Sequence, residues 1–274
     1  MISNSTSTTS AARVLVAIPA RWASTRFPGK PLALLDSQPV IAHVVRAALQ
    51  AEGIERPVLV ATDDERIAQA VRDRFEAQEV QAVMTDAGLP SGTDRLAQAL
   101  RAHLGEPESA PEAWEERLAI INVQGDEPFL NPSHIERLAR AMREHPELKM
   151  ATLGVPLSQD EDILNPNIIK IARAQDGRAL YFSRAPIPFH RDEPVQRKYL
   201  RHLGVYAYEA RWLLEMAALG PSPLEEIERL EQLRALEHGV AIRVLEVESA
   251  VDIAIDTPQD LERAQLWLRR TPDA

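Results

Sequence analysis

A group of cations follows a short apolar run near the start of the chain. Residues 14–18 are continuously apolar and predict a buried strand. Arg21, Arg26 and Lys30 come after it, among small and hydroxyl residues that include Ser24. A loop of this kind at the carboxyl end of a first strand is where an α/β sheet binds an anion, because backbone N–H groups can approach phosphate oxygens while cations neutralise their charge. The spacing matches neither the P-loop nor GxGxxG. It predicts a nucleotide-phosphate loop of another kind, with a solvated basic loop as the alternative.

Carboxylates follow two later segments. Residues 118–123 form the most apolar predicted strand, and Asp126 and Glu127 come directly after it. Carboxylates at the carboxyl end of a central parallel strand lie at the ligand crevice, and Mg²⁺ takes one or two of them together with substrate phosphates. We therefore expect Asp126 to hold a metal, although the same residues can simply begin a turn. Asp256 would complete the pair as a second ligand, or it caps the helix that follows it.

Two further strings are suited to the nucleoside. Thr62-Asp63-Asp64 ends the strand predicted over residues 57–62 and can cap a helix, contact a base or ribose, or do both. The string from Ser91 to Arg95 opens a helix, where free N–H groups and the helix dipole favour an anion or a nucleobase. A plain N-cap is the alternative interpretation of that string.

Composition limits the class of protein. The chain has 274 residues, of which 45% are hydrophobic and 26% charged, and its net charge of −10 argues against bulk electrostatic binding of nucleic acid. The absence of cysteine excludes disulfides and a thiolate nucleophile and fits a cytoplasmic protein. No apolar run reaches about 18 residues, so no transmembrane helix is expected. Residues 1–12 are rich in Ser and Thr and predict a disordered leader before one domain over residues 13–274.

The pattern of the first half alternates strand and helix, which predicts an α/β fold with a parallel sheet. The predicted strands are 14–18, 57–62, 80–84 and 118–123, and the predicted helices are 40–49, 65–75, 96–103 and 132–145. The acidic stretch 106–116 is interpreted as a surface connection, with Trp114 packed on the domain edge.

The alternation breaks over about residues 150–210. A strand over 150–156, a hairpin of 168–172 with 178–182, and a strand over 203–208 predict an inserted antiparallel layer. This layer is a natural place for a second substrate and for dimer contacts. Its polar residues are the cations and hydroxyls that a polyhydroxylated acid would need: Arg184, Arg201, His202, Tyr206 and Tyr208. Taken alone, His202 is better explained as a structural hydrogen-bonding residue.

The last part of the chain returns to helices. One helix is predicted over residues 224–237, where Glu231 and Gln232 reach a ligand only if their side faces the cleft. A strand over 241–247 and a final amphipathic helix that carries Trp267 complete the pattern.

Ten strings carry a resemblance to a known family. In chain order they are IPARWASTRFPGKPL, ATDDERIA, SGTDRLA, NVQGDEP, MATL, NPNIIK, ALYFSRAPIPF, RHLGVYAY, SPLEEIERLEQLRALEHG and DTPQDLERA. Together they resemble the 3-deoxy-manno-octulosonate cytidylyltransferases over about residues 14–268. Sialic-acid cytidylyltransferases share the style of the first loop but lack RHLG…Y and LEQLR.

The resemblance implies a three-layer α/β/α fold like that of nucleotide-diphospho-sugar transferases, with a mostly parallel sheet and an inserted antiparallel layer that forms a homodimer. It implies that CTP and 3-deoxy-D-manno-octulosonate (Kdo) give CMP-Kdo and diphosphate for lipopolysaccharide biosynthesis. In this reaction the anomeric hydroxyl of the sugar attacks the α-phosphate with the help of Mg²⁺.

Residue roles also follow from the resemblance. The CTP-binding residues are Arg21, Ser24, Arg26 and Lys30 for the triphosphate and Thr62, Ser91, Gly92 and Arg95 for the nucleoside. The Kdo-binding residues are Gln124, Arg184, His202, Tyr206, Glu231 and Gln232. The metal ligands are Asp126 and Asp256, and the catalytic residues are Lys30, Asp126, Asp256 and Arg21.

Two departures from the family pattern and two rival functions remain. Residues 251–256 replace the usual glycine-containing string, so either Asp252 or Asp256 takes the metal, and the DTP string favours Asp256. Asp94 stands where the family usually has Glu. One rival is a cytidylyltransferase for a related sugar acid, such as 8-amino-Kdo or a sialic-type acid. The other is a non-catalytic sugar-nucleotide-binding protein, against which the intact set of Lys30, Asp126 and Asp256 argues.

Overall fold

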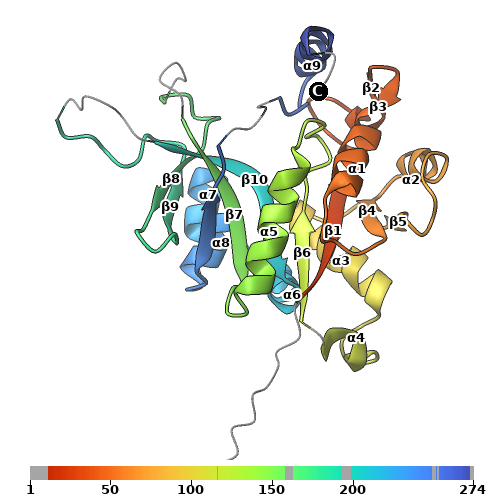
Figure 1. The fold of residues 1–274 in the computed structure, drawn as a ribbon, viewed down its shortest axis with the longest axis horizontal. Coiled ribbons are helices and arrows are strands. Elements are labelled where there is room, and N and C mark those ends of the chain that lie inside the picture. The colour runs from red at the N-terminus through yellow and green to blue at the C-terminus, as the bar shows by residue number, and fades with distance from the viewer. Residues whose placement is uncertain are drawn as a thin grey trace, which may run out of the picture.

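The computed structural model describes residues 12–115, 117–157, 163–192, 199–248, 251 and 253–271 (Figure 1). The predicted leader, apart from Ala12, and the alternative metal ligand Asp252 lie outside the described residues. None of the described helices combines the length and the apolar composition that a membrane crossing requires.

A central sheet runs through the molecule in the strand order β11-β7-β10-β6-β1-β4-β5. These strands are β1 (Arg13–Ala20), β4 (Val58–Thr62), β5 (Val80–Met84), β6 (Leu118–Asn122), β7 (Met150–Pro156), β10 (Leu200–Glu209) and β11 (Ile242–Glu246). β1 pairs in parallel with β4 and β6, β4 with β5, and β7 with β11. β10 is antiparallel to both of its neighbours, β6 and β7. The predicted α/β class with a mostly parallel sheet is confirmed.

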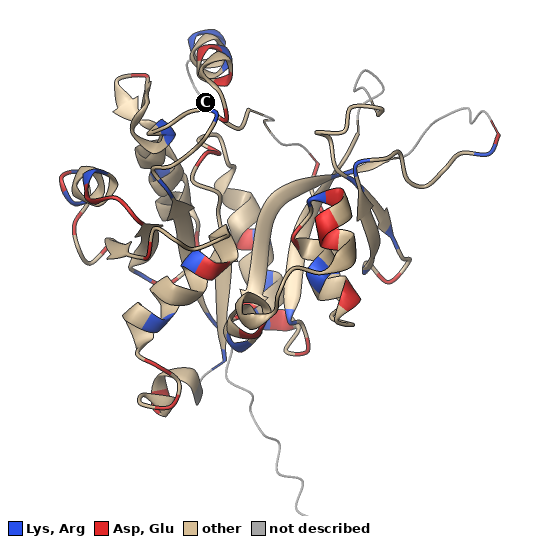
Figure 2. Cartoon of the chain, turned by 180° about the vertical axis from the view of Figure 1, so that it is seen from behind, with Lys and Arg blue, Asp and Glu red and all other residues tan. Residues whose placement is uncertain are grey.

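Helices cover both faces of this sheet, because alternate side chains of each strand point to opposite sides. Val14, Val16 and Ile18 of β1 join one core with α1 (Val40–Gln50), α2 (Glu65–Arg72) and α5 (Pro132–Glu144). Leu15 and Ala17 join the other core with α3 (Gly92–Leu104), α4 (Pro111–Glu115), α6 (Ala210–Ala218) and α8 (Gln232–Glu237). The result is the predicted three-layer α/β/α arrangement. Figure 2 shows basic and acidic residues interspersed over the helices and outer loops.

The antiparallel layer is joined to the central sheet through β10. Strand β8 (Lys170–Arg173) pairs with β10 and forms a hairpin with β9 (Ala179–Ser183), as predicted. At the other end of the molecule, α9 (Pro258–Arg270) lies beside the small hairpin of β2 (Leu34–Leu35) and β3 (Gln38–Pro39) (Figure 1). A separate apolar cluster built on Leu35, Val40, Ile255 and Ala264 holds α9 there. It brings the segment before α9 to the carboxyl edge of the sheet.

One prediction for the helices is wrong. The helix expected over residues 224–237 is two helices, α7 (Pro223–Glu228) and α8, separated by Arg229 in a left-handed conformation with φ 54°. The guanidinium of Arg184 donates hydrogen bonds to the carbonyl oxygens of Glu228 and Arg229. It thereby satisfies carbonyls that the end of a helix leaves without a partner. The break therefore depends on a side chain from another part of the chain.

Three smaller elements were not predicted. They are the 3-10 helix η1 (Lys30–Leu32), the β2–β3 hairpin and helix α6. The acidic connection also contains α4, whose Trp114 is buried and donates its indole hydrogen bond to the carbonyl of Gly105 at 3.1 Å. Trp114 thus packs on the domain as expected, although the connection itself is partly helical.

Candidate functional site

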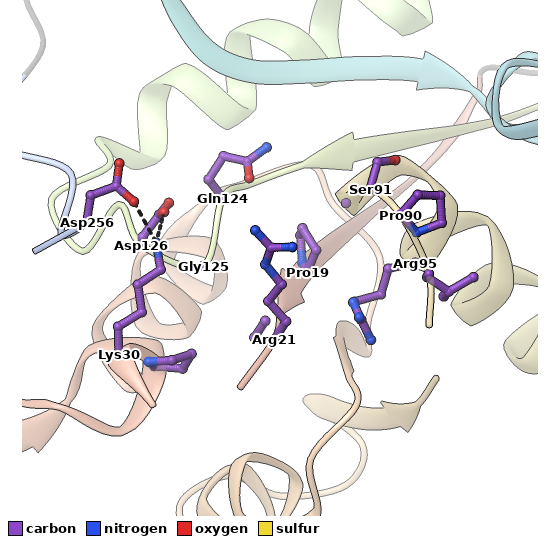
Figure 3. A pocket seen from close by; sticks show the side chains of 14 residues that line it. Pro19, Arg21, Lys30, Pro90, Ser91, Arg95, Gln124, Gly125, Asp126 and Asp256 are labelled. Carbon is purple, nitrogen blue, oxygen red and sulfur yellow. Dashed lines mark hydrogen bonds and ion pairs between the residues drawn. The ribbon is translucent and has the colours of Figure 1, made fainter. Parts of the chain in front are cut away.

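A cleft opens at the carboxyl ends of β1 and β6 (Figure 3). The two strands are parallel neighbours, so the loops that follow them emerge at the same edge of the sheet. The start of α3 and the segment before α9 complete the walls. The lining residues are Pro19, Ala20, Arg21, Lys30, Pro31, Leu89, Pro90, Ser91, Gly92, Arg95, Gln124, Gly125, Asp126 and Asp256.

One end of the cleft is built from two carboxylates and an ammonium. The Nζ of Lys30 donates to Asp126 Oδ2 at 2.5 Å and to Asp256 Oδ1 at 2.9 Å, although the two acids are far apart in sequence. Arg26 adds a contact to Asp256 Oδ2 at 3.0 Å. The backbone N–H of Ile255 donates to the carbonyl of Asp126 at 2.8 Å and ties the C-terminal segment to the end of β6. Three distant parts of the chain therefore meet at one point.

The alternative role for Asp256 as a helix cap is wrong. Thr257 is the N-cap of α9, and Asp260 closes its capping box. The side chain of Asp256 is consequently available to the cleft, where Figure 3 shows it facing Lys30.

Charge is maintained in this cluster. Burial alone would lower the pKa of Lys30, but Asp126 and then Asp256 outweigh burial and raise it. Burial alone would raise the pKa of Asp256, but the hydrogen bond and charge of Lys30, helped by Arg26, lower it. Ammonium and carboxylate are thus both ionised at neutral pH. Within the described residues, no group of three or more His, Asp or Glu side chains could hold a metal ion.

The rest of the predicted phosphate loop lines one wall. The side chain of Arg21 is exposed and lies between the Lys30 end of the cleft and the Arg95 end (Figure 3). Ser24 does not line the cleft, and its hydroxyl accepts the backbone N–H of Phe27 at 3.3 Å. The structure gives Ser24 a role in the turn of the loop, and its contact with a triphosphate stays a prediction.

The opposite end of the cleft is the start of α3. Ser91 is the N-cap of this helix, and its hydroxyl exchanges hydrogen bonds with Asp94. Gly92 and Arg95 line the cleft beside it, and Arg95 is only 2% exposed. Thr62 is fully buried, accepts the N–H of Asp64 and does not line the cleft. Three of the four residues predicted for the nucleoside are therefore together, and Thr62 stands behind them.

Gln124 and Gly125 join the two ends. A Cβ on Gly125 would lie 2.7 Å from the carbonyl oxygen of Pro19, which a side chain does not tolerate. Glycine is needed here so that the ends of β1 and β6 can approach each other. The close approach that this glycine permits in the structure is between two segments of protein backbone.

A second polar region lies behind Gln124, on β10 and at the start of α8. His202 shares a hydrogen bond of 3.0 Å with the hydroxyl of Thr152, and its ring packs between Phe182 and Tyr206. Burial lowers the pKa of His202 to about 3 and raises that of Tyr206. Both side chains are therefore neutral hydrogen-bonding groups at physiological pH.

Two polar atoms of this region have no hydrogen-bond partner among the described residues. Glu231 accepts the hydroxyl of Thr93 with Oε2 at 2.7 Å, but its buried Oε1 has no such partner. The buried Nε2 of Gln232 also has none. Buried polar atoms of this kind are rare, and a ligand is one explanation for them.

Arg184 does not line the cleft. Its guanidinium donates to the carbonyls of Pro166, Glu228 and Arg229, and its backbone N–H donates to the carboxylate of Glu228. These contacts fix the end of α7. Its predicted contact with a sugar acid stays a prediction.

The cleft and fold together define a class. A mostly parallel α/β sheet with a cationic loop after its first strand and a carboxylate after a central strand is typical of nucleotide-binding transferases. A solved structure described as a putative glucose-1-phosphate thymidylyltransferase from Bacillus anthracis in complex with a sucrose has this fold, with a TM-score of 0.64 and 18% identity over 93% of this chain and 95% of that one.

Closer relatives specify the family. The cytidylyltransferase family model matches residues 15–243. A 3-deoxy-manno-octulosonate cytidylyltransferase of Xanthomonas campestris is 44% identical over 93% of this chain and 99% of its own length, and that of Methylococcus capsulatus is 43% identical over 94% and 98%. A structure described as CMP:2-keto-3-deoxy-manno-octonic acid synthetase complexed with CTP is 37% identical, with a TM-score of 0.83 over 94% of this chain and 99% of that one. The chain belongs to the 3-deoxy-manno-octulosonate cytidylyltransferase family, which confirms the resemblance seen in the sequence.

The sequence missed some residues of the cleft. The wall formed by Leu89 and Pro90 gave no signal, because an apolar residue before a helix cap is common in any loop. Asp63 was noted only as part of a strand-end string, although it contacts both the loop and Arg95. The presence of several polar residues at that strand end was the available signal, but it did not say which side chain turns inward.

Proposed function

We propose that this protein joins CTP and Kdo to give CMP-Kdo and diphosphate. The observation that carries the proposal is the convergence of Lys30, Asp126 and Asp256 at one end of a cleft whose other end is the start of α3. The members of its family named above bear the name of this activity. The end at Lys30, where loop cations meet two carboxylates that can hold a metal, suits the triphosphate, and the end at the start of α3 suits the nucleoside.

The chemistry follows from this arrangement. The anomeric oxygen of Kdo forms a bond to the α-phosphorus of CTP and releases its proton to solvent, while the bond to the bridging oxygen breaks and diphosphate leaves. Negative charge on the phosphoryl oxygens is stabilised by the cations Arg21, Arg26 and Lys30, which the loop holds in place. Catalysis of this kind depends on positioning and charge neutralisation, so the protein needs no covalent nucleophile.

Magnesium fits the pair of aspartates. Asp126 and Asp256 already converge on one cation, the ammonium of Lys30, so their side chains are arranged as cation ligands. Two carboxylates with substrate phosphates are an ordinary Mg²⁺ site. When bound, the ion would supply Lewis-acid neutralisation of the phosphate charge. Lys30 would then be free to turn toward the triphosphate.

The sugar acid is assigned to the region behind Gln124. Neutral His202 and Tyr206 can exchange hydrogen bonds with sugar hydroxyls. The buried Gln232 Nε2 would gain the hydrogen-bond partner that it lacks within the described residues. Glu231 Oε1, which lies 3.9 Å from Arg234 NH2, would gain a hydrogen bond as well. Arg184 is kept in the proposal as a residue that shapes this region through α7.

The test is diphosphate release with purified protein, CTP and Mg²⁺, with and without Kdo. Release that depends on Kdo supports the proposal, and parallel assays with 8-amino-Kdo and a sialic acid identify the preferred sugar. Binding of CTP without any release would favour the non-catalytic alternative. Faster diphosphate release with another sugar acid would identify that sugar acid, instead of Kdo, as the substrate.

We also propose that two copies of the chain form a homodimer and that the antiparallel layer is their interface. Leu164, Leu180, Phe189 and Ile227, on or near the β8–β9 hairpin and α7, are 62–85% exposed, and a partner subunit packed on this layer would cover them. Sedimentation should show a dimer that Leu180→Asp or Phe189→Asp dissociates, while Leu266→Asp on α9 does not. The proposal also includes one catalytic domain over residues 13–274. It places the protein in the cytoplasm, which the lack of cysteine supports.

A further inference from the structure

Asp63 occupies a central place beside the nucleotide cleft. It follows β4 directly, and its side chain is only 7% exposed. Its Oδ1 accepts the backbone N–H of Trp22 at 3.0 Å, and its Oδ2 accepts the guanidinium of Arg95 at 3.2 Å. One carboxylate therefore contacts the phosphate loop and helix α3 at the same time.

The contact to Arg95 fixes a buried charge. The Arg95 side chain is 3% exposed, and its other terminal nitrogen donates to the hydroxyl of Thr85 at 2.5 Å. Burial lowers the pKa of Arg95 and the nearby charge of Arg21 lowers it further, while the charge of Asp63 opposes both effects. Asp86 adds a smaller effect of the same sign, so loss of the Asp63 carboxylate would remove the largest compensation for the burial of Arg95.

The contact to Trp22 fixes the start of the phosphate loop. The Trp22 ring stacks under the guanidinium of Arg66, which lies 3.3 Å from the ring centroid. The carbonyl of Trp22 accepts the N–H of Gly29 at 3.0 Å, and a Cβ on Gly29 would come within 2.6 Å of the ring. Trp22 thus closes the loop that carries Arg21 and Lys30, and Asp63 holds the N–H of this same residue.

We propose that Asp63 is a positioning residue that couples the phosphate loop to Arg95, so that both walls of the cleft are set before the nucleotide arrives. It acts through Trp22 and Arg95 and is not among the residues that line the cleft. Groups that are already fixed bind a ligand without the cost of ordering them. This inference rests on the proposed function for the identity of the nucleotide, CTP.

The test is Asp63→Asn, studied by calorimetric titration with CTP and by steady-state kinetics. The amide keeps one acceptor oxygen but turns an N–H₂ toward either Trp22 N–H or Arg95, so one contact is lost. The expected result is a rise of roughly 10-fold or more in the Kd and KM for CTP, as for the loss of a hydrogen bond to a charged group. The KM for the sugar acid should not change. A purely structural role would lower the active fraction and leave both KM values as they were.

Glu55→Gln is the matched control. Glu55 forms an ion pair with Arg13 at the opposite end of β1, with Arg13 NH2 2.9 Å from Glu55 Oε2. The control should bind CTP like the wild type. A Kd for CTP in Asp63→Asn within twofold of the control would overturn the inference.

Two additions keep the test decisive. If Asp63→Asn folds poorly by circular dichroism, Asp63→Glu keeps the charge but cannot meet both partners, and a CTP Kd raised several-fold is expected; an unchanged Kd overturns the inference. In a double-mutant cycle with Arg95→Gln, the loss of CTP binding free energy in the double variant should be much smaller than the sum of the losses in the two single variants. Full additivity would also overturn the inference. Titration uses CTP alone, so failure of the wild type to bind CTP would refute the proposed function rather than the role of Asp63.

Discussion

The two polar regions of this protein solve the problem of binding in different ways. The cleft at the ends of β1 and β6 is lined by charged groups, several of them exposed, which are held by ion pairs that bring distant segments together. The region on β10 and α8 is more enclosed, and His202 and Tyr206 are neutral. A triphosphate requires neutralisation of its charge, whereas a sugar ring requires directed hydrogen bonds from groups that cost little to bury. Variants of the cleft should therefore change turnover and the KM for CTP, and variants of the β10 region should change the KM for the sugar acid.

The largest effect is expected at the junction of the charged cleft. Asp126→Asn removes one of the two carboxylates that converge on Lys30, and turnover should fall by roughly 100-fold or more, in the range seen when one electrostatic stabiliser of a transition state is removed. Diphosphate release at saturating CTP, Kdo and Mg²⁺ measures the loss. Asp73→Asn on the exposed end of α2 is the control. Full activity of Asp126→Asn at saturating Mg²⁺ would remove this carboxylate from the reaction.

Lys30→Met should show that the ammonium has two roles, as a contact to the triphosphate and as the cation that pairs with Asp126 and Asp256. The variant should bind CTP more weakly and turn over more slowly, because a phosphate contact is lost. Without metal it should also lose about 2 kcal/mol of unfolding free energy, since two carboxylates remain close together without their cation. Mg²⁺ should restore more stability to Lys30→Met than it adds to the wild type.

Thermal unfolding in EDTA and in MgCl₂ measures this difference. Lys149→Met on the surface is the matched control and should respond to Mg²⁺ as the wild type does. Equal Mg²⁺ responses of Lys30→Met and the wild type would mean that the ammonium and the ion do not share a site.

The contrast between the two regions also explains what the sequence could predict. Buried strands and the rule that parallel strands present their carboxyl ends at one edge were enough to bring Lys30 and Asp126 together. Asp256 comes from a segment 226 positions beyond Lys30, and its place depends on how α9 packs on the β2–β3 hairpin. The residue pattern offered Asp256 as either a second ligand or a helix cap, and only the family resemblance chose between the two, because local pattern contains no information about that packing.

Long-range contacts account for the remaining differences. The apolar periodicity of residues 224–237 is continuous and predicts one helix. In the structure, the guanidinium of Arg184, 44 positions before Glu228, donates a hydrogen bond to the carbonyl of Glu228 at the end of α7. At the end of β4 three polar residues follow one another, and Asp63 turns inward while Asp64 caps α2. That choice is made by Trp22 and Arg95, which lie in other segments.

A smaller effect, confined to the sugar, is expected from Gln232→Leu. This change removes the buried Nε2 that has no partner within the described part of the chain, so stability should be unchanged or higher. The KM for Kdo should rise roughly 10-fold, the loss of about one hydrogen bond, and the KM for CTP should stay the same. Gln69→Leu on the exposed face of α2 is the control. A parallel rise in both KM values would contradict the separation of the two regions.

The effect that is smallest at neutral pH, and that grows only as the solution is acidified, is expected from the charge state of His202. Its pKa is about 3 in the folded protein and about 6.5 in the unfolded chain, so the unfolded state binds the proton first as the pH falls. The wild type should keep its full stability above pH 6.5 and lose up to about 1.4 kcal/mol for each pH unit below it, down to about pH 3. His202→Gln can still meet Thr152 but cannot titrate, so the gap between the two proteins, the unfolding free energy of the wild type minus that of His202→Gln, should fall steadily from about pH 6.5 to pH 4. Urea unfolding at each pH measures this gap. Because other groups titrate equally in both proteins, a constant gap would show that His202 is accessible to protons, and the neutral character of the sugar region would then have to be abandoned.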